Sequence, residues 1–319
     1  MLKVTPVLSK WVESIDLANT RVINFPSYIF LCGGKLAASG SSFYGSCRDI
    51  FYSYVKSKDD SICKNIVLAE KVIEYFDGSG YPDLLTFEKD LAAISLLTVV
   101  FSESAGAIAE LGSFSVLDNI QDRLVVVLHE DDVSSEKSFI WKGPIKYLKN
   151  RAFNNGGDNP IYVYNWKRGV ENDEYKDDDF PDASGLYQAL REFLEKRKST
   201  SLWKSEDVGH IMLLIASSLS VMQIATVEEF RLLLELFGLN KYVNNVDQYL
   251  NLLKALGLVG FKHYGNSDFF ITKNSAIDWL QWSYKKKSNA FLSSSMFVEF
   301  YKKNQDNKVK AWRSFHNNL

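Results

Sequence analysis

The chain has 319 residues, 46% hydrophobic and 14% aromatic, which is enough to form the core of one large or two medium globular domains. Its 37 basic and 39 acidic residues give a net charge of −2, which excludes an overall polycation that would attract nucleic acid or an anionic membrane. The cysteines, Cys32, Cys47 and Cys63, lack the spacing of a metal site, and no apolar run approaches a membrane span. We therefore expect a cytoplasmic protein without a bound metal or a membrane contact.

The first 24 residues predict a short amphipathic helix around 7–18 and an entry segment without chemistry. The next apolar run ends at Gly33 and Gly34, which is typical of the first strand of a nucleotide-binding type of fold and its glycine turn. The two glycines either contact a ligand or only make the turn, and the sequence leaves both interpretations open. A helix is expected over 46–56.

Further apolar runs predict four more strands, at 65–70, 96–101, 124–128 and 161–164. The first of them ends at Glu70, where ligands collect outside the carboxyl ends of strands in an open sheet. A helix that carries Glu88 precedes the second. Because the runs lack polar alternation and helices separate them, we expect an α/β fold with a doubly wound parallel sheet covered on both faces.

The most informative stretch is 98–115, a strand followed by a Ser-Glu-Ser-Ala-Gly turn and a small-residue helix with one carboxylate. Ser102 and Ser104 can cap this helix and donate hydrogen bonds, and its first N–H groups favour an anion. Gly106 permits close approach of a ligand, and Glu110 lies four residues later on the same helical face. The stretch predicts a nucleotide or nucleoside site with Glu110 as the reacting acid. The alternative is an ordinary strand–helix unit with a solvent-facing glutamate.

Residues 151–182 are rich in glycine, asparagine and acids and predict a surface connection, and a helix over 184–198 leads into a mostly helical second half. There, three amphipathic helices precede a hairpin with Gly265-Asn266 at its tip, which is the order of a winged helix; we expect them over 205–222, 227–237 and 246–256.

The third of these helices carries one lysine, Lys254, and one acid, Asp247, so charge favours contact with a protein over specific reading of DNA. A last helical segment is expected over 276–303, with a basic start and an aromatic stripe for packing. The predicted domains are an N-terminal segment, a catalytic α/β domain and a helical domain, with the boundaries 1–24, 25–182 and 183–319.

Four patches, 29–34, 84–92, 101–115 and 137–149, give the chain a resemblance to a known family. It resembles the retron-associated effector proteins that join a nucleoside 2-deoxyribosyltransferase-like domain to a C-terminal winged helix. The third patch is the most specific, because the family's Glu in its ELG(A/S)FS segment falls on Glu110.

The chain departs from related proteins in the turn before this helix. Ser104 and Ala105 stand where the family often has Ser-Pro, which should alter the rigidity of the turn more than the chemistry. A deoxyribosyltransferase proper usually has an Asp in the turn and a Gly-Thr before the helix, and Ser and Ala residues hold those places here. This second departure argues against transfer of a sugar between bases.

The resemblance implies an enzyme of antiphage defence that breaks an N-glycosidic bond. It implies a toxin that cleaves NAD, as a substrate rather than a cofactor, when released from a complex with the retron reverse transcriptase and its msDNA. It also makes self-association plausible, because the resembling transferases often complete each pocket with a neighbouring subunit. The alternatives are an enzyme acting on other nucleotides or deoxynucleosides, a nucleotide-sensing DNA-binding regulator without catalysis, and an inactive scaffold.

Breaking a C1′–N bond passes through an oxocarbenium-like state, which a carboxylate such as Glu110 stabilises or captures as an ester. Nicotinamide leaves NAD from a ring that is already cationic and needs no general acid, and the sequence shows possible acids but no histidine motif, which favours NAD. Glu103 either holds a ribose hydroxyl or caps the helix. The expected substrate contacts are residues of the two turns and the nearby acids: Gly33, Gly34, Glu70, Glu88, Ser102, Glu103, Ser104 and Gly106.

Overall fold

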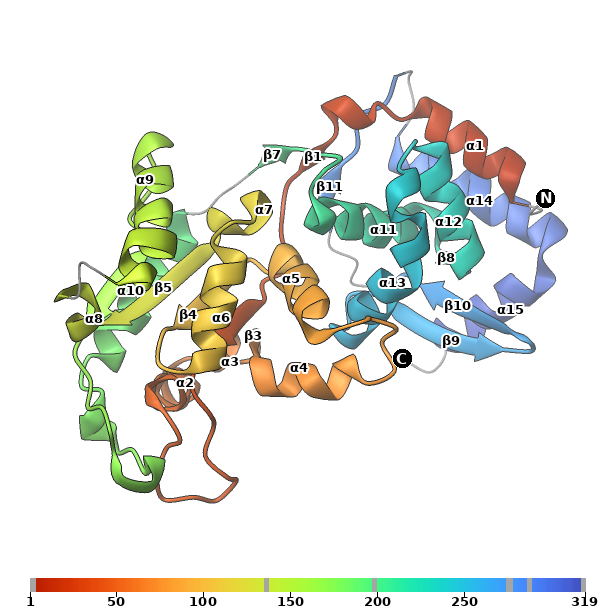
Figure 1. Cartoon of the computed structure of the whole chain (residues 1–319). Helices are drawn as coiled ribbons and strands as arrows, with labels where there is room; N and C mark the ends of the chain where they lie inside the picture. The colour runs from red at the N-terminus through yellow and green to blue at the C-terminus, as the bar shows by residue number, and fades with distance from the viewer. Residues whose placement is uncertain (1–3, 135–137, 197–199, 274–277, 286–288, 317–319) are drawn as a thin grey trace. The chain divides into compact units, whose positions relative to one another are not determined.

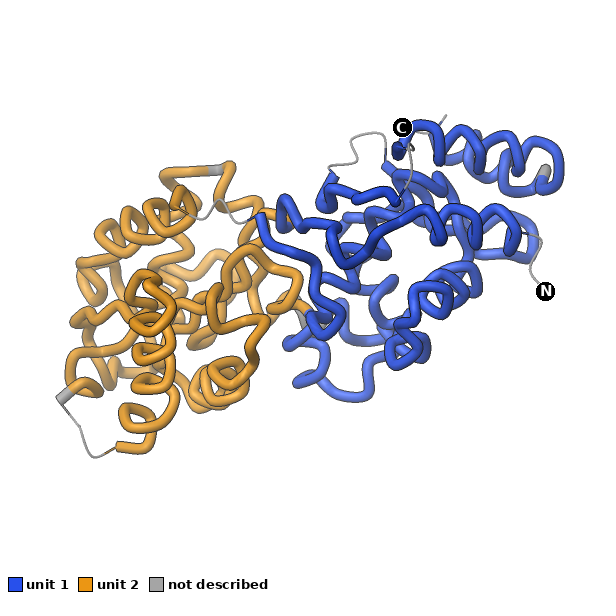
Figure 2. The backbone as a smooth tube through the Cα atoms, turned by 90° about the horizontal axis from the view of Figure 1, so that it is seen from above, with its two compact units in different colours: residues 1–25, 75–90, 199–319 blue, residues 26–74, 91–198 orange. Residues whose placement is uncertain are grey.

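A computed structural model of the chain describes residues 4–134, 138–196, 200–273, 278–285 and 289–316. The chain forms two compact units, which Figure 2 shows in different colours. We call residues 26–74 and 91–198 the α/β unit, and residues 1–25, 75–90 and 199–319 the helical unit. The predicted domains were contiguous, whereas these units interleave along the chain. No helix among the described residues is both long and apolar enough to span a bilayer.

The α/β unit is built on five parallel strands in the order β3-β2-β4-β5-β6, of which Figure 1 labels β3, β4 and β5. Every residue of β2, β4 and β5 is buried, which explains why these runs are apolar without alternation. The five predicted strands and the parallel sheet are confirmed. The strands are β2 (Ile29–Cys32), β3 (Ile66–Leu68), β4 (Leu97–Phe101), β5 (Leu124–His129) and β6 (Ile161–Tyr164).

Helices cover both faces of this sheet, as expected for a doubly wound fold (Figure 1). Helices α2 (Cys47–Lys58) and α10 (Ala183–Lys196) pack in one core with β2, β4 and β5. Helix α6 (Ala105–Phe114) packs on the opposite face, where the rings of Phe30 and Phe114 lie 6.2 Å apart. The unit also contains short elements that connect these: α3 (Asp60–Cys63), α7 (Asp118–Gln121), α8 (Glu130–Ser134), η2 (Trp141–Ile145), α9 (Lys146–Asn154), η3 (Glu171–Asp173) and η4 (Asp177–Asp179).

Two helices continue from one unit into the other along the chain. They are α4 (Ala69–Phe76) and α5 (Leu84–Ile94). Glu70 was expected at the end of a strand, but that strand ends at Leu68 and Glu70 lies in the first turn of α4.

The helical unit contains the three expected helices, α11 (Val208–Met222), α12 (Val227–Leu236) and α13 (Val246–Ala255). The hairpin of β9 (Gly260–Tyr264) and β10 (Ser267–Ile271) follows, with β8 (Ile224–Ala225) paired to β10. Gly265 at the hairpin tip has φ 61°, a left-handed conformation that favours glycine. The helices and the hairpin are confirmed, and their assignment as a winged helix stays a prediction.

A second small sheet, in the order β11-β1-β7, pairs a strand near the N-terminus with two strands from the second half of the chain. The expected helix over 276–303 is wrong in its first part, because Leu280–Gln281 forms strand β11. Helix α14 begins only after Asn289, whose side chain accepts from the Leu292 N–H at 2.9 Å and so caps it. Ala276 and most of the basic run at 285–287 lie outside the described residues. The other elements are α1 (Thr5–Ser14), η1 (Leu17–Asn19), β1 (Arg21–Val22), β7 (Ser201–Leu202), η5 (Asn240–Asn245), α14 (Ala290–Asn304) and α15 (Asp306–His316).

Segment 75–90 packs against α13 within the helical unit. The side-chain amide of Gln248 donates to the Gly80 carbonyl at 2.9 Å, and that of Asn251 donates to the Ser79 carbonyl at 3.0 Å. Polar side chains of the helix that would read DNA therefore already have partners in the same unit.

Asp90, at the end of this segment, makes the stability of the protein depend on pH. Burial raises the pKa of its carboxyl to about 6, although the Tyr81 hydroxyl donates to it at 2.9 Å. The neutral acid stabilises the fold below the ordinary pKa of 3.8, and this contribution is lost as the pH rises through about 6. We expect Asp90→Asn to raise the unfolding free energy at pH 7.5 by about 1–3 kcal/mol. Urea unfolding at several pH values should show that the extra unfolding free energy of Asp90→Asn disappears near pH 4. An increase that is the same at every pH would contradict this account.

Candidate active site

The candidate site lies where the strand order of the sheet reverses. β2 lies between β3 and β4, and the chain leaves β2 for α2 on one face and β4 for α6 on the other. In open α/β sheets such a switch point opens a crevice at the carboxyl ends of the strands. The turns after β2 and β4, which the sequence singled out separately, meet here.

Glu103, in the turn after β4, caps the helix that follows β2. Its Oε1 accepts from the N–H groups of Gly34 at 2.9 Å and Arg48 at 3.1 Å, and its Oε2 accepts from the N–H of Cys47 at 3.0 Å. The Ser46 hydroxyl accepts the third N–H of α2 at 3.2 Å, so the free donors at the start of this helix are satisfied. Of the two roles left open for Glu103, helix capping is the one observed, on α2 rather than on α6.

We expect Glu103→Gln to destabilise the fold by about 1–3 kcal/mol, because an amide turns one acceptor into a donor and leaves a backbone N–H without a partner. The matched control is Glu192→Gln, which changes an exposed glutamate on α10. Its free energy of unfolding in urea should differ little from that of wild type. Equal unfolding free energies of the two variants would contradict the capping role.

Packing within the protein accounts for both glycines of the first turn. A Cβ on Gly33 would lie 2.8 Å from the Arg48 Cβ, and one on Gly34 would lie 2.6 Å from the Ser46 Cβ. Any larger residue would push α2 away from the end of β2. The turn interpretation thus explains these residues, and contact of their backbone with a substrate stays a prediction.

The serines of the second turn are held by the fold. The Ser104 hydroxyl accepts from the Ala107 N–H at 3.1 Å as the N-cap of α6, as expected, and donates to the Gly33 carbonyl at 3.1 Å. Ser102 is buried, and its N–H donates to the Val127 carbonyl at 3.0 Å. Gly106 differs from both, because it is exposed and a Cβ there would meet only the Ser104 Oγ, at a van der Waals distance of 4.0 Å. Of the predicted contacts in this turn, Gly106 offers a free surface to a ligand.

Arg48 is a site residue that sequence reasoning missed. Its buried guanidinium donates to the Leu31 carbonyl at 3.2 Å, to the Gly34 carbonyl, and to Glu70 Oε2 at 2.8 Å. Glu70 remains 41% exposed at its side chain, so the ion pair reaches from the core to the surface of the switch point. The sequence signal was its spacing. Arg48 stands three residues before Phe51, which is buried, and this spacing places both on the inner face of α2.

Glu110 lies partly buried on α6 near this ion pair. The Cys32 side chain, at the end of β2, hydrogen-bonds to its carboxyl, and its Oε2 is buried with no hydrogen-bond partner in the described part of the chain. Burial raises the pKa of Glu110, the Cys32 hydrogen bond and Arg48 lower it, and the negative charge of Glu70 raises it. The solvent-facing alternative is therefore wrong. A buried carboxylate oxygen without a partner costs the fold stability, which singles out Glu110 as a candidate for function, and the catalytic role itself stays a prediction.

The remaining expected site residue, Glu88, is buried on α5 within segment 75–90, which belongs to the helical unit. Cavities of about 310–500 Å³ are lined by other residues, so the case for Glu110 rests on its contacts and burial. Within the described ranges, no cluster of three or more histidine, cysteine or acidic residues is arranged to hold a metal ion.

The sheet, its switch point and the carboxylates beside it define an α/β protein of the doubly wound class with a candidate ligand site. The chain belongs to the STM3845 retron effector protein family, whose model matches residues 44–261. The match includes Arg48, Glu70, Glu103 and Glu110 and begins after the first glycine turn. The resemblance to retron effectors is thereby confirmed.

Two relatives from Escherichia coli are similar to this chain. One is named "Retron Ec86 putative ribosyltransferase/DNA-binding protein" and is 30% identical over 140 residues, which are 42% of this chain and 40% of the relative. The other is named "Retron Ec73 putative ribosyltransferase/DNA-binding protein" and is 22% identical over 314 residues, which are 91% of this chain and 90% of the relative. The alignment with the Ec86 relative thus spans less than half of that protein, whereas the Ec73 alignment spans nearly both chains.

Proposed function

We propose that this retron effector is an N-glycosidase that cleaves the nicotinamide–ribose bond of NAD, with Glu110 as the reacting carboxylate. One observation supports this assignment above the others, the buried Oε2 of Glu110 without a partner beside the switch point. Membership of the effector family and the ribosyltransferase in the printed names of the two relatives support a reaction at a sugar.

In the proposed reaction the C1′–N bond breaks and its electron pair neutralises the pyridinium ring, so that nicotinamide leaves without a proton donor. Positive charge grows on the anomeric carbon opposite the ionised Glu110, which stabilises it or forms an ester. Water then adds to C1′ and loses its proton, which gives ADP-ribose. The start of α6, where Gly106 is exposed, would face the pyrophosphate, because the free N–H groups of a helix start favour anions.

The test is to incubate the purified chain, free of reverse transcriptase and msDNA, with NAD and separate the products by chromatography. We expect nicotinamide and ADP-ribose in equal amounts. Consumption of another nucleotide or a deoxynucleoside with NAD left intact would overturn the choice of substrate, and no consumption of any would overturn the enzymatic proposal.

Cys32 is proposed to position and tune Glu110 rather than to react. Its hydrogen bond lowers the pKa of the Glu110 carboxyl, so Cys32→Ala should raise that pKa further. Because the ionised acid is the active form, we expect the acidic limb of the pH–rate profile to move to higher pH while the rate at alkaline pH changes little. A loss of rate that is equal at all pH values would indicate a packing defect instead.

We further propose that the protein works in the cytoplasm as a toxin of antiphage defence, held inactive by the retron reverse transcriptase and msDNA. Support comes from the family alone. Co-expression with both partners should keep cellular NAD intact, and omission of either should release NAD consumption. Self-association belongs to the same proposal, and sedimentation analysis of the purified chain tests it.

A second candidate function is a nucleotide-sensing, DNA-binding regulator, with α11–α13, β8 and the β9–β10 hairpin forming a winged helix. The printed names of both relatives support it. The contacts of α13 oppose it, because Gln248 and Asn251 already bind segment 75–90 and Lys254 lies over the Phe261 ring at 4.2 Å. Retention on duplex DNA that falls steeply as salt rises would support the regulator, since phosphate contacts release counterions.

A further inference from the structure

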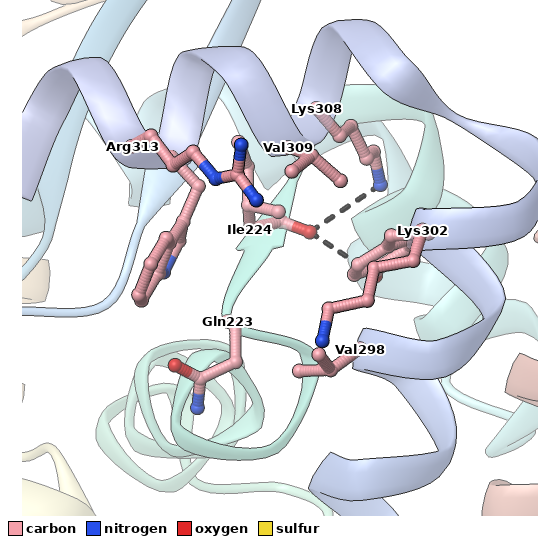
Figure 3. Close-up of a pocket in the computed structure, with 9 residues that line it drawn as sticks. Gln223, Ile224, Val298, Lys302, Lys308, Val309 and Arg313 are labelled. Atoms are coloured by element: carbon pink, nitrogen blue, oxygen red, sulfur yellow. Dashed lines mark hydrogen bonds between the residues drawn. The ribbon is translucent and has the colours of Figure 1, made fainter.

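The helical unit contains a cavity of about 310 Å³ between α14, α15 and the start of β8. Val298, Val309 and Ile224 line it, as Figure 3 shows, and Trp312 is a further lining residue. A cavity of this size and lining is typical of sites that take a small molecule with an apolar body.

The polar groups at the base of the cavity are satisfied within the protein. The Ile224 carbonyl accepts from the Tyr301 hydroxyl at 3.2 Å and from the Lys308 ammonium at 3.3 Å, which Figure 3 shows as dashed lines. Lys308 also forms a buried ion pair with Glu229. The base therefore requires no polar group from a ligand, and an apolar body suits it.

Two cations and one donor surround the cavity. Lys302 of α14 and Arg313 of α15 are exposed and form no ion pair with the described residues, and Figure 3 shows them on either side of Ile224. The indole Nε1 of Trp312 is buried without a hydrogen-bond partner in the described part of the chain. Together these groups favour a negative charge on whatever the cavity holds.

The wall next to β8 is strained. Gln223 adopts φ 65° and ψ −40°, a region that non-glycine residues avoid, and its side-chain amide is held by the Ser220 carbonyl at 2.6 Å and the Ser294 hydroxyl at 3.3 Å. Strain of this kind costs about 1–3 kcal/mol and persists where the surroundings fix it, often at ligand sites.

We propose that this cavity binds a small organic anion, with an apolar aromatic or aliphatic body inside and one carboxylate, sulfonate or phosphate group between Lys302 and Arg313. The site lies wholly in the helical unit and involves none of the residues around Glu110. The proposal therefore stands or falls independently of the proposed reaction.

The test compares two fluorescent probes with the same body. 8-Anilinonaphthalene-1-sulfonate carries one anionic group, and N-phenyl-1-naphthylamine carries none. Titration of the full chain should show saturable binding of the sulfonate, at least about ten times tighter than that of the neutral probe. Equal affinities, or no saturable binding of the sulfonate, would overturn the proposal.

Variants then locate the probe. Lys302→Gln with Arg313→Gln should weaken sulfonate binding about tenfold or more and leave the neutral probe unchanged. The matched control is Lys303→Gln, a neighbouring exposed lysine on α14 that does not line the cavity. Val309→Trp, or Val298→Phe if the former does not fold, should fill the cavity and abolish binding of both probes. Undiminished sulfonate binding in a folded filled variant would overturn the assignment.

Discussion

Glu110→Gln is expected to reduce release of nicotinamide from NAD by about a hundred- to a thousand-fold or more, the range for loss of a group that stabilises transition-state charge. The amide keeps the shape of the side chain and the capacity to accept from Cys32, but it carries no charge to meet the positive anomeric carbon. Single-turnover measurements with saturating NAD separate this loss from weaker binding, because the rate of the chemical step should fall.

The same substitution should leave the fold intact, which makes the loss of activity interpretable. Burial raises the pKa of Glu110, so its ionised form costs stability at neutral pH. We therefore expect Glu110→Gln to unfold at the same or a higher urea concentration than wild type at pH 7.5. The difference should disappear as the pH falls through the raised pKa towards the ordinary value of 4.5, where wild type also becomes neutral.

A cellular measurement completes this prediction. Wild type, Glu110→Gln and the exposed control Glu192→Gln are induced in cells without the retron partners, and NAD is followed over time. Depletion is expected with wild type and with the control. Equal depletion by Glu110→Gln would show that the catalytic assignment is wrong, and NAD that stays intact in all three would remove the proposed substrate.

The sequence predicted the sheet well because both faces of its strands are buried. The runs that became β2, β4 and β5 are apolar at every position except Thr98 and His129, and such runs are unambiguous when helices flank them. The boundary at Glu70 was less clear, because a strand that ends directly in a helix leaves no turn residue between them. The helix expected over 276–303 was wrong at 280–281 for a related reason, since a two-residue strand such as β11 leaves almost no periodic signal.

Only part of the candidate site could be predicted from the sequence. Glu110 and Ser104 could be placed because helix caps and helix faces follow from local spacing. Glu103 bonds to backbone groups 55–69 positions away, so local spacing could assign it only to its own helix. The packing of segment 75–90 on α13 was equally hidden, because it joins residues about 170 positions apart.

Arg48→Met is expected to destabilise the α/β unit by about 3–5 kcal/mol, the range for removing one partner of a buried ion pair. Methionine can fill the space of the side chain, but it donates no hydrogen bond. The carbonyls of Leu31 and Gly34 would lose a donor, and Glu70 would lose its partner. The turn after β2 and the start of α2 should loosen together, because Arg48 links them.

The matched control is Arg191→Met on α10, an exposed arginine whose ion pair with Glu195 is 3.3 Å long. Such surface pairs contribute about 0–1 kcal/mol, so urea unfolding should separate the two variants clearly. Loss of Arg48 also removes the nearby positive charge that lowers the pKa of Glu110, so that pKa should rise. Under conditions in which the variant is still folded, the acidic limb of its pH–rate profile should therefore lie at higher pH than that of wild type. Equal stability of the two methionine variants would show that the ion pair does not hold the switch point together. An unchanged pH–rate profile would show that Arg48 does not lower the pKa of the Glu110 carboxyl.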